Sequence, residues 1–118
     1  MKRIIYVEDD RDTAEACKKI LESAGYEVSL AYTGKEGVQR ILHEIFDLAL
    51  LDIMLPDMSG WDVFQKVKHK AMKFAFLSAL EVSPERYKEL HKAGLADYIT
   101  KPFTKQSLLQ RVAAILRK

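Results

Sequence analysis

The sequence contains a single cysteine, Cys17, so no disulfide can form within the chain and no second thiolate can share a metal ion with it. Cys17 falls in the apolar phase of a predicted helix, which favours a core residue over a redox role. No stretch approaches the roughly 18 consecutive apolar residues that a membrane-spanning helix needs. Because Met1–Ile4 leads directly into a predicted strand, we expect no signal peptide and a cytoplasmic protein.

The sequence also has little net charge and no linker. Its 19 basic and 17 acidic residues leave a formal charge of +2, which is too balanced to predict direct binding to nucleic acid. The basic residues in Arg111–Lys118 are explained by a helix C-terminus, where cations are favourable. No Pro/Gly/Ser-rich linker, low-complexity tract or internal repeat divides the 118 residues. We therefore expect one domain over residues 1–118.

What the sequence does contain is a regular alternation of strand and helix patterns. Short apolar runs, typical of buried parallel strands, predict strands at Arg3–Val7, Leu48–Leu51 and Phe74–Leu77, and further strands are expected at Glu27–Ala31 and Asp97–Ile99. A first helix is predicted at Asp12–Ala24, and later helices follow the caps Thr33, Ser59, Ser83 and Thr104. The apolar stripe of the second helix is expected at Val38, Ile41, Leu42 and Ile45. This order predicts a doubly wound α/β fold, in which helices cover both faces of a parallel sheet.

Polar residues directly follow several of these apolar runs. Glu8 and Asp9 follow the first strand, Asp52 the third, Ser78 the fourth and Lys101 the fifth. Because open α/β sheets bind ligands at the carboxyl ends of their strands, we expect these side chains to meet in one cleft. Taken singly, Asp52 fits a turn residue and Lys101 a solvated lysine. Together, three carboxylates, a hydroxyl and an ammonium suit a divalent cation and a phosphoryl group.

Two segments carry a more specific pattern, Asp52–Gly60 (DIMLPDMSG) and Asp97–Phe103 (DYITKPF). Together with Glu8 and Asp9, they resemble the receiver domain of two-component response regulators, and the resemblance extends along the whole chain. It implies the flavodoxin-like strand order 2-1-3-4-5, which the alternation of elements alone does not distinguish from the other common doubly wound order. The segment His69–Lys73 is shorter than receivers usually carry.

The resemblance also implies a role for each residue of the cleft. Asp52 would accept a phosphoryl group, and the cofactor would be Mg²⁺ (or Mn²⁺). Asp9, Asp52 and the backbone carbonyl of Met54 would bind the ion directly, and Glu8 would act mainly through water. Lys101 would neutralise charge on the phosphoryl oxygens.

By the same resemblance, Ser78 and Tyr98 are switch residues that carry the modification to a response surface. That surface would comprise Ser83–Ala93, the fifth strand and Lys105–Lys118. The peptide bond between Lys101 and Pro102 would be cis. The implied partners are a histidine kinase or phosphotransfer protein, a downstream output protein or fused output domain, and a second phosphorylated copy of the chain. No contact with a membrane or with nucleic acid is expected.

Two other functions fit parts of the pattern. An aspartate-nucleophile phosphohydrolase would need a second aspartate two residues after Asp52, where this chain has Met54. A degenerate receiver that only binds proteins would lack a site residue, whereas all are present here. We therefore favour a phosphoryl-accepting switch with no enzymatic activity beyond its own phosphorylation and dephosphorylation. Because neither Met54 nor Leu80 can orient an attacking water, we also expect a long-lived phosphoryl group.

Overall fold

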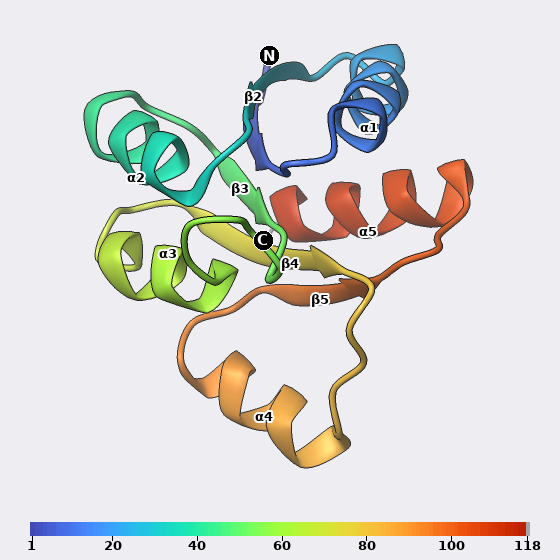
Figure 1. Ribbon diagram of the computed structural model, residues 1–118. Coiled ribbons are helices and arrows are strands. Elements are labelled where there is room, and N and C mark those ends of the chain that lie inside the picture. The colour runs from blue at the N-terminus through green and yellow to red at the C-terminus, as the bar shows by residue number, and fades with distance from the viewer. Residues whose placement is uncertain (118) are drawn as a thin grey trace.

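The computed structural model describes residues 1–117 and places five strands and five helices in strict alternation (Figure 1). The strands are β1 (Arg3–Val7), β2 (Glu27–Ala31), β3 (Leu48–Leu51), β4 (Lys73–Ser78) and β5 (Asp97–Thr100). The helices are α1 (Arg11–Ser23), α2 (Gly34–His43), α3 (Gly60–Val67), α4 (Pro84–Lys92) and α5 (Lys105–Arg117). Every predicted element is present; the first three strands have the predicted bounds, and the other boundaries differ by one or two residues. Within residues 1–117, no helix combines the length and the apolar character needed to cross a bilayer.

The strands form one parallel sheet in the order β2-β1-β3-β4-β5, which confirms the order that the family resemblance implied. β1 pairs with β2 on one side and with β3 on the other. The direction of winding therefore reverses between β1 and β3, and such a switch point is where open α/β sheets form their ligand sites. The register places Val7 opposite Leu51, so the residues that follow these two strands are neighbours.

The strands are largely buried on both faces, so their side chains divide between two cores. One core lies between the sheet and α2, α3 and α4, and the other lies between the sheet and α1 and α5. Alternate residues of β1 point to opposite cores: Ile5 and Val7 to the first, Ile4 and Tyr6 to the second. Figure 1 shows α1 and α5 together on one side of the sheet, with α2 and α3 on the other.

Side chains at the helix termini match most of the predicted boundaries. The predicted caps are confirmed, with side-chain oxygens accepting backbone hydrogen bonds at Thr33, Ser59, Ser83 and Thr104. Asp10 caps α1, which therefore begins at Arg11 and not at Asp12. Gly25 and Gly94, which follow the ends of α1 and α4, have φ angles of 93° and 106°. This left-handed conformation favours glycine and ends a helix.

The predicted apolar stripe of α2 is partly wrong. Leu42 is 39% exposed, and Ile45 is 84% exposed and lies beyond the end of the helix. Ile41 is buried and Val38 packs partly buried against the core, as predicted, and the other buried residues of α2 are Gly34 and Gly37. A Cβ atom on Gly37 would lie 2.7 Å from a methyl carbon of Val7, so glycine is what allows α2 to pack this closely on β1. A search for apolar side chains at helical spacing gives glycine no weight. For this reason the sequence pattern predicted Leu42 and Ile45 for the buried face and missed the two glycines.

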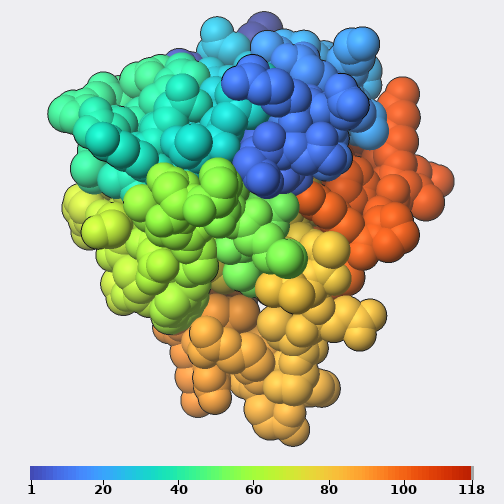
Figure 2. Space-filling view, in the orientation of Figure 1, coloured from blue at the N-terminus to red at the C-terminus, as the bar shows by residue number. Residues whose placement is uncertain are grey.

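α4 is the helix least anchored in the core. Its one buried residue is Leu90, whereas each of the other helices buries at least three residues. Two polar contacts supplement this anchor: the Tyr87 hydroxyl donates to Asp97 at 3.1 Å, and the Arg86 guanidinium lies 4.9 Å from the ring centre of Trp61. Figure 2 shows α4 and the segment before it projecting from the rest of the surface. Few buried contacts are typical of an element with low local stability.

Candidate functional site

Three carboxylates lie together at the carboxyl ends of β1 and β3. Glu8 and Asp9 follow β1 directly, and Asp52 follows β3. One carboxylate oxygen from each of the three residues lies within 4.8 Å of the other two. Glu8 is 2% exposed and Asp52 is 5% exposed, whereas Asp9 is open to solvent. Like charges this close repel one another unless a cation compensates them.

Glu8 is held by donors from three directions. The Tyr6 hydroxyl donates to Oε1 at 3.0 Å, and the backbone N–H of Asp10 donates to Oε2 at 3.2 Å. The Lys101 ammonium also donates to Oε1. These bonds explain how an almost fully buried carboxylate is tolerated. Burial, together with the charge of Glu8, raises the pKa of the Tyr6 hydroxyl far above its usual value.

Asp52 uses its two oxygens differently. Oδ1 accepts a hydrogen bond from the backbone N–H of Met54 at 3.0 Å, and Oδ2 accepts one from the Lys101 ammonium at 3.0 Å. Burial raises the pKa of Asp52 above its ordinary value, although both hydrogen bonds act in the opposite direction. A buried anion of this kind gains more from a nearby cation than an exposed carboxylate does.

Lys101 reaches both buried carboxylates from the end of β5. Its ammonium forms ion pairs with Glu8 and with Asp52. Burial by itself would lower the pKa of Lys101, but the hydrogen bonds to the two carboxylates outweigh it and raise the pKa. The backbone N–H of Lys101 donates to the Ser78 carbonyl at 2.8 Å, which ties the chain after β5 to the end of β4. The peptide bond between Lys101 and Pro102 is cis, as the resemblance implied.

The loop between β3 and α3 is held in place at several points. A Cβ atom on Gly60 would lie 2.1 Å from the carbonyl oxygen of Asp52, so glycine alone permits this approach. Met54 and Ser59 form an isolated antiparallel bridge across the loop. The carboxylate of Asp57 accepts hydrogen bonds, both at 2.8 Å, from the first two backbone N–H groups of α2. The loop is therefore fixed both to its own strand and to a neighbouring helix.

Ser78 and Tyr98 both contact the segment that leads from β4 to α4. Ser78 is fully buried, and its hydroxyl accepts a hydrogen bond from the Leu80 backbone N–H at 3.4 Å. The Tyr98 hydroxyl donates to the Leu80 carbonyl. The Tyr98 ring is buried and packs edge-on against Phe76, with 6.0 Å between ring centres. Both hydrogen bonds therefore end on the backbone of Leu80, in the segment between β4 and α4.

The donor set of this cleft fits a hard divalent cation. Mg²⁺ prefers oxygen ligands, usually takes one or two protein carboxylates and keeps several water molecules. Glu8, Asp9 and Asp52 supply three carboxylates, and the exposed Asp9 leaves the cleft open to an incoming ion. The adjoining Lys101 supplies a positive charge for an anionic ligand. The cleft can therefore bring together a cation, a nucleophilic carboxylate and a phosphoryl group.

The family model of the response regulator receiver domain matches residues 4–113. The chain belongs to this family. The receiver is 40% identical over 112 residues to the transcriptional regulatory protein DltR of Streptococcus agalactiae serotype III (strain NEM316), a match that covers 93% of the receiver and 50% of DltR. It is 39% identical over 118 residues to the transcriptional regulatory protein CusR of Escherichia coli (strain K12), covering 98% of the receiver and 52% of CusR. The chain thus spans about half the length of the curated relatives it matches.

Solved structures of receivers share the fold. The receiver domain protein (CheY-like) from Methanospirillum hungatei JF-1 is 38% identical, with a TM-score of 0.90 over 99% of this receiver and 94% of that chain. The response regulator TrrA from Thermotoga maritima is 30% identical, with a TM-score of 0.85 over 98% of this receiver and 100% of that chain. The TrrA structure is of a complex with Mg(2+)-BeF. This chain is therefore a receiver domain of the two-component response regulators.

Two residues of the receiver's cleft have contacts that the sequence patterns did not reveal. Tyr6 was expected only as part of an apolar strand, yet its hydroxyl reaches Glu8. The two-residue periodicity of a strand was an available signal, because it places Tyr6 on the same side of the chain as Glu8. Asp57 was expected only as a loop residue, and no sequence signal indicated its bonds to α2. The expectation that Cys17 is a core residue is confirmed.

We predict that Mg²⁺ stabilises the receiver against unfolding, because a cation would relieve the repulsion among the three carboxylates. At a hundredfold excess over its dissociation constant, a ligand bound only by the folded state adds about 2.7 kcal/mol to the free energy of unfolding. Chemical denaturation with Mg²⁺ and with EDTA measures this gain. Asp9→Asn should lose most of it, whereas Asp12→Asn, at an exposed position in the first turn of α1, should keep it. A full gain in Asp9→Asn would contradict the assignment of Asp9.

Proposed function

We propose that this receiver acts as a phosphoryl-accepting switch and that Asp52 is its phosphoacceptor. The observation that carries the proposal is the position of the Asp52 carboxylate. It is buried at the end of β3, beside two other carboxylates, and one of its oxygens is paired with Lys101. A buried carboxylate with this surrounding suits both a nucleophile and a cation ligand. Lys101 lies where its charge can stabilise a phosphoryl group on Asp52.

We infer that the cofactor is Mg²⁺ or Mn²⁺, held directly by Asp9, Asp52 and the Met54 backbone carbonyl, with Glu8 acting through water. The cluster of three carboxylates supports this ligand set, as does the position of Met54, whose N–H is bonded to Asp52. When bound, the ion neutralises charge on the phosphoryl oxygens during transfer. The Met54 backbone N–H and the Lys101 ammonium orient the two oxygens of Asp52.

In the proposed reaction, a carboxylate oxygen of Asp52 attacks the phosphorus of a phosphohistidine on the donor protein. An O–P bond forms as the P–N bond of the phosphohistidine breaks, and the electron pair stays on the imidazole nitrogen, which takes up a proton. The products are an acyl phosphate at Asp52 and a neutral imidazole. The ammonium of Lys101 would then pair with one phosphoryl oxygen, and the Ser78 hydroxyl would donate a hydrogen bond to another.

The switch proposal connects this site to α4, β5 and α5. Ser78 would turn toward the phosphoryl group and Tyr98 would follow it, which would alter both hydrogen bonds to Leu80. The weak anchoring of α4 by Leu90 makes it the element most easily displaced. Between these elements lies a surface hollow of about 430 Å³, whose lining includes Tyr87, Asp97 and Arg111. The proposed response surface therefore already contains a concave feature that a partner can recognise.

The proposed partners follow from the family and from the curated relatives. A histidine kinase or phosphotransfer protein would supply the phosphoryl group. DltR and CusR are transcriptional regulatory proteins about twice the length of this chain. Their length suggests that this domain acts on a downstream output protein or on a fused output domain. A phosphorylation-dependent homodimer is a further proposed state. Residues 1–118 would form the single receiver domain of such a cytoplasmic system, and the receiver would catalyse only its own phosphorylation and dephosphorylation.

We predict that Asp52 is the only phosphoacceptor and that its phosphorylation requires a divalent cation. Incubation with acetyl phosphate and Mg²⁺ should add one phosphoryl group, measured by intact-protein mass spectrometry, and EDTA should prevent this. Asp52→Asn should abolish the addition because an amide cannot form the acyl phosphate. Asp62→Asn is a matched control, since Asp62 lies in the first turn of α3 and an asparagine there can still accept the backbone N–H of the capping residue Ser59. Equal labelling of Asp52→Asn would rule out the assignment.

A second prediction concerns coupling between Asp52 and α4. Ser78→Ala should still be phosphorylated by acetyl phosphate, but phosphorylation should alter amide hydrogen exchange in α4 and β5 much less than in the wild type. Coupling energies of this kind are typically worth about 5-fold or more, so the difference is measurable. Ser23→Ala removes an exposed hydroxyl at the C-terminal end of α1 that bonds only to the Ile20 carbonyl within residues 1–117, and it should behave as wild type. A full response in Ser78→Ala would show that the signal takes another route.

A third prediction is that the phosphoryl group on Asp52 is long-lived. Met54 and Leu80 lie two residues beyond Asp52 and Ser78, are 60% and 44% exposed, and offer no hydrogen bond to an attacking water. The double variant Met54→Asn with Leu80→Glu should lose phosphate about 10-fold faster, which corresponds to roughly 1.4 kcal/mol of barrier. The control is Met54→Leu with Leu80→Met, which keeps both positions apolar. If the polar variant decays no faster than this control, the two positions do not control the water.

A further inference from the structure

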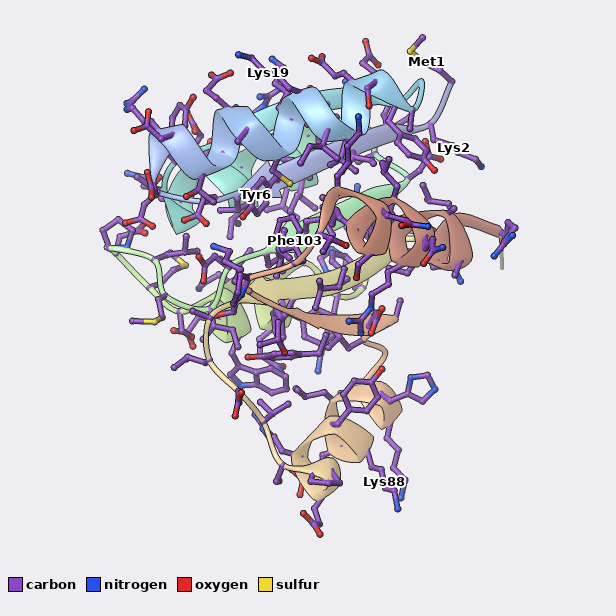
Figure 3. The ribbon with its side chains drawn as sticks, turned by 90° about the vertical axis from the view of Figure 1, so that its right-hand side faces the viewer. Met1, Lys2, Tyr6, Lys19, Lys88 and Phe103 are labelled. Atoms are coloured by element: carbon purple, nitrogen blue, oxygen red, sulfur yellow. The ribbon has the colours of Figure 1, made fainter. Side chains whose placement is uncertain are left out.

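Tyr6 is a fully buried tyrosine whose hydroxyl reaches the carboxylate cluster. It lies in β1 and faces the core formed with α1 and α5, where none of its surface is exposed to solvent. Figure 3 shows Tyr6 in the interior, beneath α1. Glu8 follows two residues later on the same side of the chain, and the Tyr6 hydroxyl donates to its Oε1 at 3.0 Å. A side chain of the core thus ends in the functional cleft.

The hydroxyl matters because core packing alone does not account for it. A phenylalanine would fill almost the same volume, and β4 of the same sheet uses phenylalanine at Phe74 and Phe76. Burying a hydroxyl without a partner costs free energy, and the carboxylate of Glu8 is the partner that removes this cost. The carboxylate in turn gains a donor that comes from the protein interior.

The Tyr6 bond also fixes the orientation of Glu8. Oε1 receives the Tyr6 hydroxyl and the Lys101 ammonium, and Oε2 receives the backbone N–H of Asp10. Of these donors, the Lys101 ammonium is the one that must turn to the phosphoryl group in the proposed reaction. If Tyr6 were absent, this movement would leave Oε1 of a nearly fully buried carboxylate without a donor from these three groups. With Tyr6 present, Oε1 keeps a hydrogen bond throughout.

We propose that Tyr6 is a positioning residue, whose hydroxyl holds the Glu8 carboxylate in its metal-binding orientation and keeps it hydrogen-bonded when Lys101 moves away. The inference rests on the proposed function of the Glu8, Asp9 and Asp52 cluster. Groups that hydrogen-bond to metal-associated carboxylates set the orientation of these ligands, and their loss typically weakens metal binding by about 10-fold to 100-fold. Tyr6 would therefore influence metal affinity without touching the ion.

The test removes one oxygen atom. Tyr6→Phe keeps the ring and its packing, and Mg²⁺ binding is measured by isothermal titration calorimetry on the whole chain, without any phosphoryl donor. We expect the Mg²⁺ dissociation constant to rise about 10-fold. Tyr26→Phe is the matched control, because Tyr26 packs against the same core and its hydroxyl has no hydrogen bond within residues 1–117. This control should bind Mg²⁺ with wild-type affinity.

A double-mutant cycle shows whether the effect of Tyr6 on Mg²⁺ affinity depends on Glu8. If Tyr6 acts through Glu8, Tyr6→Phe should have no further effect on Mg²⁺ affinity in a Glu8→Ala background, where no side-chain oxygen remains to accept the Tyr6 hydroxyl. A persistent 10-fold effect in that background would overturn the proposal, because Tyr6 would then act by another path. The cycle also guards against a general loss of packing, since a damaged core would weaken binding in both backgrounds.

The remaining outcomes separate this inference from the proposed function. If the wild type binds Mg²⁺ and Tyr6→Phe binds it equally well, the role of Tyr6 is wrong and the metal site stands. If the wild type binds no Mg²⁺, the proposed metal site is wrong and the role of Tyr6 falls with it. Phosphorylation by acetyl phosphate provides a second reading: at saturating Mg²⁺, Tyr6→Phe should still be slower than Tyr26→Phe, because Glu8 retains Lys101 more strongly.

Discussion

The Lys101 ammonium, which lies between two buried carboxylates, is the interaction on which the site depends. Glu8 follows β1, Asp52 follows β3 and Lys101 follows β5, so one ion-pair network joins three strand ends. β4 separates β3 from β5 in the sheet, and the long lysine side chain spans that strand. Without this cation, two nearly fully buried negative charges would face each other in a medium that screens them poorly. A bound metal ion or a phosphoryl group changes this balance of charge directly.

The surrounding structure keeps the charges in place through close backbone approaches and directed hydrogen bonds. Gly60 lets the loop after β3 turn back against the carbonyl of Asp52, and Asp57 ties the same loop to the first turn of α2. Tyr6 supports Glu8 from the core. In contrast, α4 is anchored by Leu90 and a few polar contacts. The molecule thus combines a well-fixed cleft with a loosely held helix. In such an arrangement, a local change of charge in the cleft can alter the conformation of a distant element.

Much of the fold and of the candidate site could be predicted from the sequence. Apolar runs such as Leu48–Leu51 predicted buried strands, and caps such as Ser83 predicted helix starts, because both depend on neighbours in the chain. The convergence of Glu8, Asp9 and Asp52 could be predicted as well, since the carboxyl ends of neighbouring parallel strands meet at one edge. The strand order itself came from the family resemblance, because alternation of elements is compatible with more than one order.

Only the tertiary structure decided which partners the side chains find across the molecule. The hydroxyl of Tyr6 bonds to Glu8, and Asp57 caps a helix that lies more than twenty residues earlier in the chain. The buried face of α2 contains Gly37, packed on β1, and Gly34, packed against Met58, where the apolar count had favoured Leu42. The physical reason is the range of the interactions. Periodicity and capping act between residues close in sequence and can be read from it, whereas close backbone approach and hydrogen bonds between elements exist only once the chain has packed.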